Sequence, residues 1–402
     1  MNNKIFEPTL LAGIKLKNKI IRSATHEGMA DDKGYPTELL KNTYIQLAKG
    51  EVGAIITGYA GMQQNGKSPF YRMSMISDDS YIDCYRDLVD TVHRYDTPII
   101  MQIAHCGRQT RSIITGERPV APSAIRDKCY NEEMPKELTQ VEIYEIINAF
   151  VNAIERAKKA GFDGVQLHAA HGYLLAQFLS PYINHRSDNW GGNTANRFRI
   201  IDEIYKKARK KTGDYPILVK MNAYDGRKNG MRIEEAIKIA KLLEKTGCPC
   251  IEVSSGIFED GFSSVRIKEI PADLLLKYSF RYRKFDESSP LVKSIIKLKI
   301  NMFTSKCKPL HNYNVQAAAA IKEEVSIPVI VVGGIRRIQD ISDIIDNGKA
   351  DFISMCRPFI VEPNIVKRFK EEKQNTSRCI SCCRCGIIQS QNPIRCYYLE
   401  NR

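Results

Sequence analysis

Short, almost continuously apolar segments recur along the chain, separated by stretches that include clear amphipathic helices. The apolar segments are residues 19–24, 53–58, 98–103, 163–168, 216–221, 250–254, 328–332 and 351–355. Strands that are buried on both faces of a sheet have this composition, whereas strands with one solvated face alternate apolar and polar residues. Two of the helical segments, 141–160 and 232–246, stop just before a glycine, which is typical of a helix C-cap.

Eight such strands with intervening helices predict an α/β fold, specifically a closed (β/α)8 TIM barrel. An open doubly wound sheet is the alternative, but it should have a glycine-rich turn directly after the first strand, and residues 25–27 are not one. We expect the barrel over residues 1–375 and a short cysteine-rich C-terminal extension over 376–402. An excursion at 258–314 interrupts the repeat after the sixth strand. It either covers the active site and shapes substrate access, or is a surface excursion without a catalytic part.

Composition and length narrow the class of protein further. The 402 residues are 43% hydrophobic, which is ample for a large core, and the N-terminus has no continuous apolar segment of the signal-peptide kind. No apolar run approaches the roughly 18 residues of a transmembrane helix, so we expect no membrane partner. Twelve cysteines without an export signal indicate reduced thiols and a cytoplasmic location.

The formal net charge of +14 is compatible with nucleic acid, but equally with an anionic cofactor or substrate. The basic residues are spread over amphipathic helical segments such as 204–211 and 236–245, where they form solvated faces. We therefore expect a small-molecule partner and no nucleic acid.

Barrel enzymes place their chemistry at the C-terminal ends of the strands. Read in turn, these ends carry Ala24, Thr25, Gly58, Gln102, His168, Lys220, Gly333, Gly334, Cys356 and Arg357. Consecutive glycines at the seventh strand let the backbone approach a phosphate, and a guanidinium at the eighth can bind the same anion. A helix-packing turn is the alternative for the two glycines.

His168 and His171 are three residues apart, so they would share one face if this segment were helical. Such a pair can bind zinc, or it can donate two hydrogen bonds to one anionic oxygen. A structural role in the core is the third interpretation. Tyr173 can donate a proton, because a phenol with a pKa near ~10 stays protonated at neutral pH.

At this point the motifs resemble those of the old yellow enzyme family, over about residues 3–370. The segments that carry the resemblance are RSAT (22–25), QIAH (102–105), HAAHGYLL (168–175), QFLSP (177–181), NHR (184–186) and the residues around WGG (190–192). The long block from 168 to 186 is far more specific than a lone glycine motif. Within the family, the chain looks most similar to the barrel domain of the enoate reductase and 2,4-dienoyl-CoA reductase branch.

The resemblance implies an FMN-dependent oxidoreductase that is reduced by NADH or NADPH and passes hydride to the β-carbon of an unsaturated carbonyl substrate. His168 and His171 would hydrogen-bond the carbonyl oxygen and stabilise the developing enolate, as an oxyanion site does. Tyr173 would protonate the α-carbon.

The resemblance also implies the cofactor contacts. Gln102 and Lys220 would contact the flavin ring, where many relatives have arginine in place of Lys220, so redox tuning is expected to differ. The remaining contacts divide into Ala24, Thr25 and Gly58 along the isoalloxazine, and Gly333, Gly334, Cys356 and Arg357 at the phosphate.

The C-terminal segment holds five cysteines within eighteen residues, which is typical of a metal site. The expected ligands are Cys379, Cys382, Cys385 and Cys396, with Cys383 left over. The segment is similar to the one that carries a [4Fe-4S] cluster in the branch named above. It departs from that segment in two ways. The spacing between the second and third expected ligands, Cys382 and Cys385, is shorter, and Cys383 stands where asparagine is usual. Zinc and free thiols therefore stay open.

Two function hypotheses follow, an ene-reductase and an electron-transfer subunit that uses FMN and a cluster with a separate partner. In the related branch, FAD and NAD(P)H domains follow the barrel, whereas this sequence ends at Arg402. Either NAD(P)H reduces the FMN directly, or an electron-donor protein does. A homo-oligomer is compatible with both. A metal-dependent hydrolase built on His168 and His171 lacks a third ligand nearby.

Overall fold

The computed structural model describes residues 3–129, 133–260, 264–302 and 309–399. Parallel strands form a ring in which each strand pairs with the next and the last, β13, pairs with the first, β3. The eight strands of the ring are β3 (Ile20–Arg22), β4 (Ala54–Ile56), β6 (Ile99–Ala104), β9 (Gly164–Ala169), β10 (Ile217–Asn222), β11 (Ile251–Ser254), β12 (Val329–Val332) and β13 (Phe352–Met355). Each overlaps one of the eight apolar segments, with β6, β9 and β10 extending one residue beyond theirs, so the predicted (β/α)8 barrel is confirmed.

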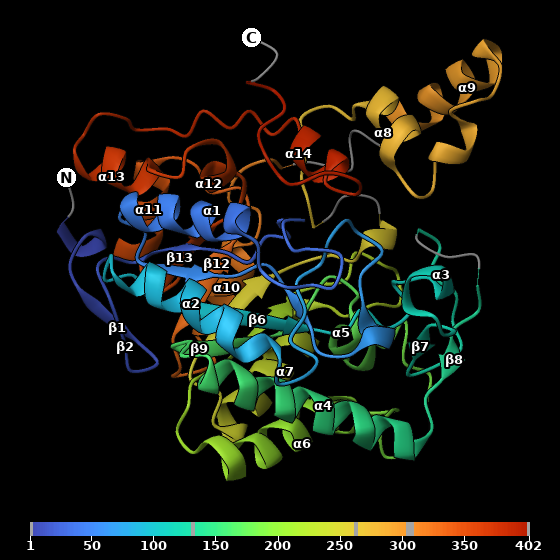
Figure 1. Cartoon of the computed structure of the whole chain (residues 1–402), viewed down its shortest axis with the longest axis horizontal. Coiled ribbons are helices and arrows are strands. Elements are labelled where there is room, and N and C mark those ends of the chain that lie inside the picture. Colours follow the sequence, from blue (N-terminus) through green and yellow to red (C-terminus); the bar gives the residue numbers. More distant parts are fainter. Residues whose placement is uncertain (1–2, 130–132, 261–263, 303–308, 400–402) are drawn as a thin grey trace.

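Helices surround the ring (Figure 1). The longer ones are α1 (Glu38–Lys49), α2 (Tyr81–His93), α4 (Gln140–Lys159), α6 (Thr194–Thr212), α7 (Ile233–Thr246), α10 (Val315–Lys322) and α11 (Ile338–Asp346). The helices expected at 141–160 and 232–246 are α4 and α7. A capping box of Thr139 and Glu142 begins α4, and Gly247, with φ of 87°, caps α7. Among the described residues, no helix is both long and apolar enough to cross a membrane.

The remaining elements around the barrel are short. They are β5 (Ala60–Gly61), α3 (Ser112–Thr115), β7 (Val120–Ala121), β8 (Lys136–Glu137), α5 (Leu174–Leu179), α12 (Arg357–Val361), α13 (Ile365–Lys370), α14 (Arg384–Ile388) and the 3₁₀ turns η1 (Asn3–Ile5), η2 (Gln64–Gly66) and η3 (Phe258–Asp260). β5 extends the pairing of β6.

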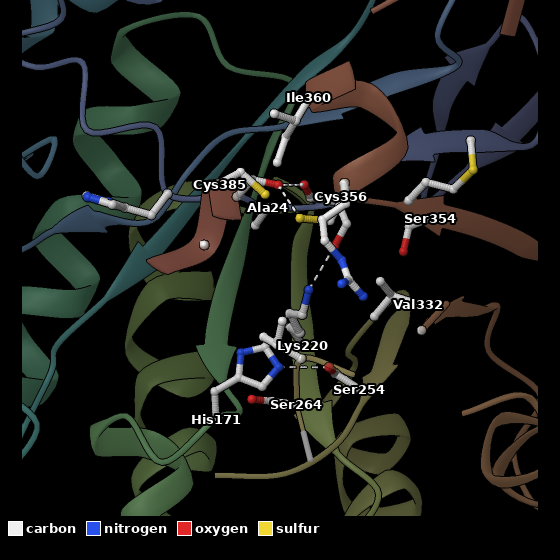
Figure 2. Close-up of a pocket in the computed structure, with 18 of the residues that line it drawn as sticks. Ala24, His171, Lys220, Ser254, Ser264, Val332, Ser354, Cys356, Ile360 and Cys385 are labelled. Carbon is white, nitrogen blue, oxygen red and sulfur yellow. Dashed lines mark hydrogen bonds between the residues drawn. The ribbon is translucent and has the colours of Figure 1, made fainter. Parts of the chain in front are cut away.

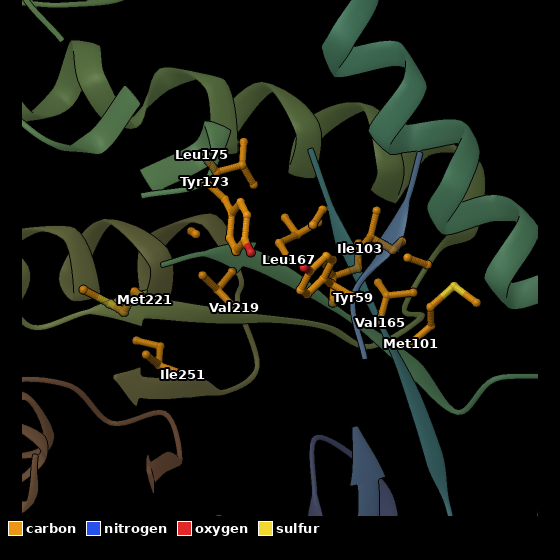
Figure 3. Packing of buried hydrophobic residues seen from close by; sticks show 14 of the residues in the cluster. Tyr59, Met101, Ile103, Val165, Leu167, Tyr173, Leu175, Val219, Met221 and Ile251 are labelled. Carbon is orange, nitrogen blue, oxygen red and sulfur yellow. The ribbon is translucent and has the colours of Figure 1, made fainter. Parts of the chain in front are cut away.

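The apolar core has two layers because consecutive strand residues point to opposite faces of the sheet. Ile20 and Ile55 belong to the outer layer, between strands and helices, while their neighbours Ile21 and Ile56 belong to the inner one. Figure 3 shows part of the outer layer over β6, β9, β10 and β11. The hairpin of β1 (Thr9–Leu11) and β2 (Ile14–Leu16) packs into the inner layer against the early residues of the strands, so it closes the N-terminal end of the barrel.

The excursion after β11 contains α8 (Ala272–Tyr278), η4 (Arg283–Phe285) and α9 (Pro290–Asn301), which project from one side of the barrel (Figure 1). α14 of the cysteine-rich segment packs on α8. Ile267, Leu275, Cys383 and Ile387 belong to one buried cluster there. The excursion and the cysteine-rich segment therefore form a joint structure.

A buried ion pair fixes the end of the first barrel strand. Arg22 donates to Glu27 Oε1 at 2.6 Å and to the Ile56 carbonyl at 2.6 Å, which ties β3 to β4. Both charged side chains are almost fully buried, with 5% and 4% exposed. Tyr44 Oη and the Gly58 N–H donate to the same carboxylate at 2.8 and 3.0 Å.

We expect Glu27→Gln to lower the free energy of unfolding by about 3–5 kcal/mol, because it leaves the buried Arg22 charge uncompensated. Urea denaturation at neutral pH measures the change. Glu38→Gln is the matched control, since its side chain is 76% exposed and its pair with Lys41 lies on the surface; we expect a loss within about 0.5 kcal/mol. Equal losses in the two variants would contradict the structural role of the buried pair.

Candidate functional site

A cavity of about 1130 Å³ lies at the C-terminal ends of the strands (Figure 2). It collects nearly all of the residues that the sequence singled out: Ala24, Thr25, Gln102, His168, His171, Tyr173, Lys220, Gly333, Gly334, Cys356 and Arg357. Gly58 is outside this lining, and its N–H donates to Glu27.

The two histidines meet through a strand end and a turn, and not through a helix. His168 is on β9, while His171 follows in a left-handed conformation with φ of 60°. Their rings are perpendicular with centroids 5.1 Å apart, and the Tyr173 ring lies 4.8 Å from His168. His171 Nε2 is 2.8 Å from Ser254 Oγ, an interaction drawn in Figure 2. His168 Nδ1 is buried and has no hydrogen-bond partner within the described part of the chain.

Burial decides the charge of the histidine pair. It lowers the pKa of His171 to about 3, with a further contribution from the positive charge of Lys220. Burial, His171 and Lys220 likewise hold the pKa of His168 well below its usual value. Both rings are therefore neutral at neutral pH, and each can donate one N–H. No group of three or more His, Cys, Asp or Glu side chains arranged for a metal occurs in the described parts of the chain.

Tyr59 belongs to the same cluster, although sequence reasoning gave it no role. Its ring centroid is 5.3 Å from that of Tyr173, and the two hydroxyls share a hydrogen bond. Its hydroxyl is also 3.1 Å from Ser68 Oγ. Burial raises the pKa of Tyr59, so the hydroxyl next to Tyr173 stays protonated.

A buried carboxylate under the cavity is the second residue that sequence reasoning missed. Glu252 on β11 lies 3.3 Å from Lys220 Nζ, and neither side chain is more than 3% exposed. Ser23 Oγ and Ser354 Oγ donate to Glu252 Oε1 at 2.7 and 2.6 Å, and Gln166 Nε2 donates to Oε2 at 2.8 Å. Burial alone would raise the pKa of Glu252, but Lys220 and these donors hold it below its usual value. The sequence signal that could have identified Glu252 is a glutamate inside an otherwise apolar strand.

The same network reaches Gln102, the other side chain expected on a flavin ring. Gln102 Nε2 donates to Gln166 Oε1 at 2.7 Å, and Gln166 in turn donates to Glu252. Gln102 and Lys220 are thus positioned by one carboxylate.

The opposite end of the cavity fits an anion. Gly333 and Gly334 have φ of 148° and 75°, conformations that favour glycine. Arg336, which sequence reasoning missed although it follows them closely, is 3% exposed. Its side chain shares a hydrogen bond with Cys379, while its Nε and Nη1 have no hydrogen-bond partner among the described residues. Burial and the neighbouring Arg357 lower the pKa of Arg336. A buried guanidinium with free donors beside a second one, Arg357, suits a phosphate group.

The cysteines of the C-terminal segment converge on a small pocket next to Arg357, lined by Cys379, Cys382, Cys383, Cys385 and Cys396. Cys383 and Cys385 also line the main cavity. Burial raises the pKa of Cys383 to about 11 and that of Cys385 well above its usual value. All of the predicted ligands line this one pocket, but no three of these side chains, within the part of the chain that the structure describes, are arranged to hold a metal. Metal binding stays a prediction.

Comparison with known proteins shows similarity to one protein family. A sequence profile of the NADH:flavin oxidoreductase / NADH oxidase family matches residues 4–260 and 283–376. The NADH oxidase of Thermoanaerobacter brockii is 35% identical over 399 residues, which cover 98% of this chain and 55% of that protein. The NADPH dehydrogenase of Geobacillus thermodenitrificans is 30% identical over 366 residues, which cover 90% of this chain and 92% of that protein.

Among solved structures, 2-naphthoyl-CoA reductase in complex with 2-naphthoyl-CoA superposes with a TM-score of 0.82 at 23% identity, covering 98% of this chain and 57% of that one. This likeness supports the barrel fold. The chain spans about half the length of the NADH oxidase and of a similar metal reductase from Desulforamulus reducens, which it covers by 55% and 50%.

His105, at the end of β6, gives a test of burial that does not depend on a bound cofactor. The Gly107 N–H donates to its Nδ1 at 3.0 Å and Asn65 Oδ1 is 3.1 Å from its Nε2, so the ring is held neutral. Burial lowers the pKa of His105 to about 3.

We expect the free energy of unfolding to fall as the pH is lowered from about 6.5 towards 3, because only the unfolded chain binds a proton at His105 in that window. The contribution of the neutral His105 ring to the free energy of unfolding is fully present above about pH 6.5. In His105→Gln, the slope of unfolding free energy against pH, measured by urea titrations at several pH values, should decrease by about 1.4 kcal/mol per pH unit. Parallel slopes in variant and wild type would show that His105 is not held neutral by the fold.

Proposed function

Since the chain belongs to the NADH:flavin oxidoreductase / NADH oxidase family, we propose that it transfers hydride from reduced FMN to the C=C bond of an α,β-unsaturated carbonyl compound. Membership makes it a flavin oxidoreductase of the old yellow enzyme type that uses FMN and NAD(P)H. The alkene acceptor is what we add. The observation that carries it is the pair of neutral, buried histidines beside Tyr173.

The geometry of His168 and His171 suits a carbonyl oxygen. Both rings are neutral, and their perpendicular arrangement allows two N–H groups to reach one acceptor. Such donors gain strength as negative charge develops on the oxygen, so they favour the transition state over the ground state. Neutral donors also keep that oxygen unprotonated until Tyr173 delivers a proton to the α-carbon. Tyr59 shares the hydrogen bond that orients the Tyr173 hydroxyl.

FMN supplies the hydride when bound, and the cavity offers contacts for each part of it. Lys220 and Gln102 would contact the ring together with Ala24 and Thr25. Arg336 would join Gly333, Gly334, Cys356 and Arg357 at the phosphate. Gly58 stays a prediction, because its N–H is bound to Glu27 and it lies outside the cavity lining.

We further propose that Cys379, Cys382, Cys385 and Cys396 bind a [4Fe-4S] cluster. The support is their convergence on one pocket, and the position of Cys385 between that pocket and the main cavity. A cluster there would lie at the edge of the flavin site. This position favours the second candidate function, in which a separate protein delivers electrons through the cysteine segment.

Replacing Tyr173 by phenylalanine removes the proposed proton donor and keeps the ring. In stopped-flow experiments, we expect re-oxidation of the reduced flavin by cyclohexenone to slow by about 10²- to 10⁴-fold. Reduction of the flavin by NAD(P)H should stay close to the wild-type rate. Tyr95→Phe, which removes a hydroxyl outside the cavity lining, is the control. An unchanged re-oxidation rate in Tyr173→Phe would remove the tyrosine from the mechanism.

Metal analysis of anaerobically purified protein tests the cysteine segment. We expect about four iron atoms per chain and the broad absorption of an iron–sulfur cluster. Cys382→Ser should lose most of the iron, whereas Cys383→Ser, the matched control at the neighbouring position, should retain it. Stoichiometric zinc would replace the cluster by a structural zinc site, and metal-free protein would leave free thiols.

A further inference from the structure

A second chamber, of about 870 Å³, adjoins the cavity with the histidine pair. We propose that it binds a flat, apolar group of the substrate, such as an aryl ring, that carries an anionic substituent at its outer end. The inference deepens the proposed function, since it assumes that the reacting carbonyl group is held at His168 and His171.

The two spaces are adjacent. Phe70, Phe258, Ser264, Val265 and Gly386 line both of them. A substrate anchored at the histidines would reach the chamber past the two phenylalanines.

The chamber walls are aromatic. Tyr278, Phe280 and Tyr282 complete the set begun by Phe70 and Phe258. The Phe70 ring is tilted by 47° to Phe258 and by 60° to Phe280, with centroids 6.1 and 5.8 Å away. Rings set at such angles accept a further flat ring in offset or edge contact.

The buried carboxylate of the chamber is already paired with two guanidinium groups. Glu259 is the carboxylate of this lining, and it is fully buried next to Arg108 at 3.1 Å and Arg227 at 3.5 Å. The interior therefore favours an apolar group and offers no free carboxylate to a cationic one.

The outer mouth of the chamber is basic. An outer cavity shares Cys129, Phe280, Arg281 and Tyr282 with the chamber. Its charged lining comprises Arg111, Lys128, Arg281, Arg283 and Lys284 against Glu133, Asp286 and Glu287. The Arg281 guanidinium stacks on Tyr282, 5.5 Å from the ring centroid, at the boundary of the two spaces. A guanidinium held in this way can bind an anionic group at the end of an aromatic ligand.

Much of the chamber lies outside the part of the barrel that the family profile describes. The family profile leaves residues 261–282 unmatched, between its two aligned parts. That stretch supplies Ser264, Val265, Leu275, Tyr278, Ser279, Phe280, Arg281 and Tyr282 to the chamber. The shape and charge of the chamber are thus not set by the part of the barrel that the profile matches.

Three alkenes test the assignment with FMN-loaded enzyme: cyclohexenone, benzylideneacetone and the para-carboxylate of benzylideneacetone. The methyl ester of the carboxylate is a fourth, uncharged substrate for comparison. We expect Phe280→Ala to lower the kcat/KM of both aryl ketones relative to cyclohexenone by about five- to tenfold. Arg281→Gln should lower the kcat/KM of the carboxylate relative to its methyl ester by about tenfold. Lys299→Gln, which removes a charge on α9 outside these cavities, is the control with wild-type ratios.

Titration calorimetry with the saturated product, para-carboxybenzylacetone, separates the chamber from the reaction. Weaker binding in Phe280→Ala and Arg281→Gln, without reduction of any alkene, would overturn the proposed function and support the chamber. Reduction of all three alkenes with unchanged ratios in both variants would overturn the chamber and support the proposed function. An altered ratio for the aryl ketones but equal rates for acid and ester would overturn the anionic substituent.

Discussion

The site depends on a buried charge at the centre of the barrel. Lys220 lines the cavity with only 3% of its side chain exposed, where an unpaired ammonium would be strongly destabilising. Glu252, on the neighbouring strand, compensates it at 3.3 Å and in turn accepts hydrogen bonds that begin at β9, at β13 and just beyond β3. One carboxylate therefore joins strands from different parts of the ring and holds Lys220 and Gln102 in place.

The positive charge of Lys220 also contributes to the protonation state of the two histidines. Burial is the main reason that their pKa values are low, and the positive charge of Lys220 adds to it. Neutral rings serve as hydrogen-bond donors without adding a second positive charge to the cavity. The histidine pair and Lys220 are thus one electrostatic arrangement.

The sequence predicts the barrel well because strands buried on both faces leave an unmistakable apolar pattern, and because the barrel brings all strand ends together. The cavity residues from Ala24 to Arg357 follow from those two facts. Tyr59, Glu252 and Arg336 do not, because their roles come from contacts across strands or loops that are distant along the chain. The histidine spacing suggested a helical face, whereas the positive φ of His171 creates the pairing. Such a turn has no signature in the spacing alone.

The excursion and the cysteine-rich segment pack against each other. α14 packs on α8 through Ile387 and Leu275, and Cys383 is buried in the same cluster. Gly386 on α14 faces both the flavin cavity and the aromatic chamber. A displacement of α14 would therefore alter the walls of both spaces and the positions of the cysteines at once. Electron delivery through the cysteine segment and substrate selection by the chamber would then be coupled through the packing of one short helix.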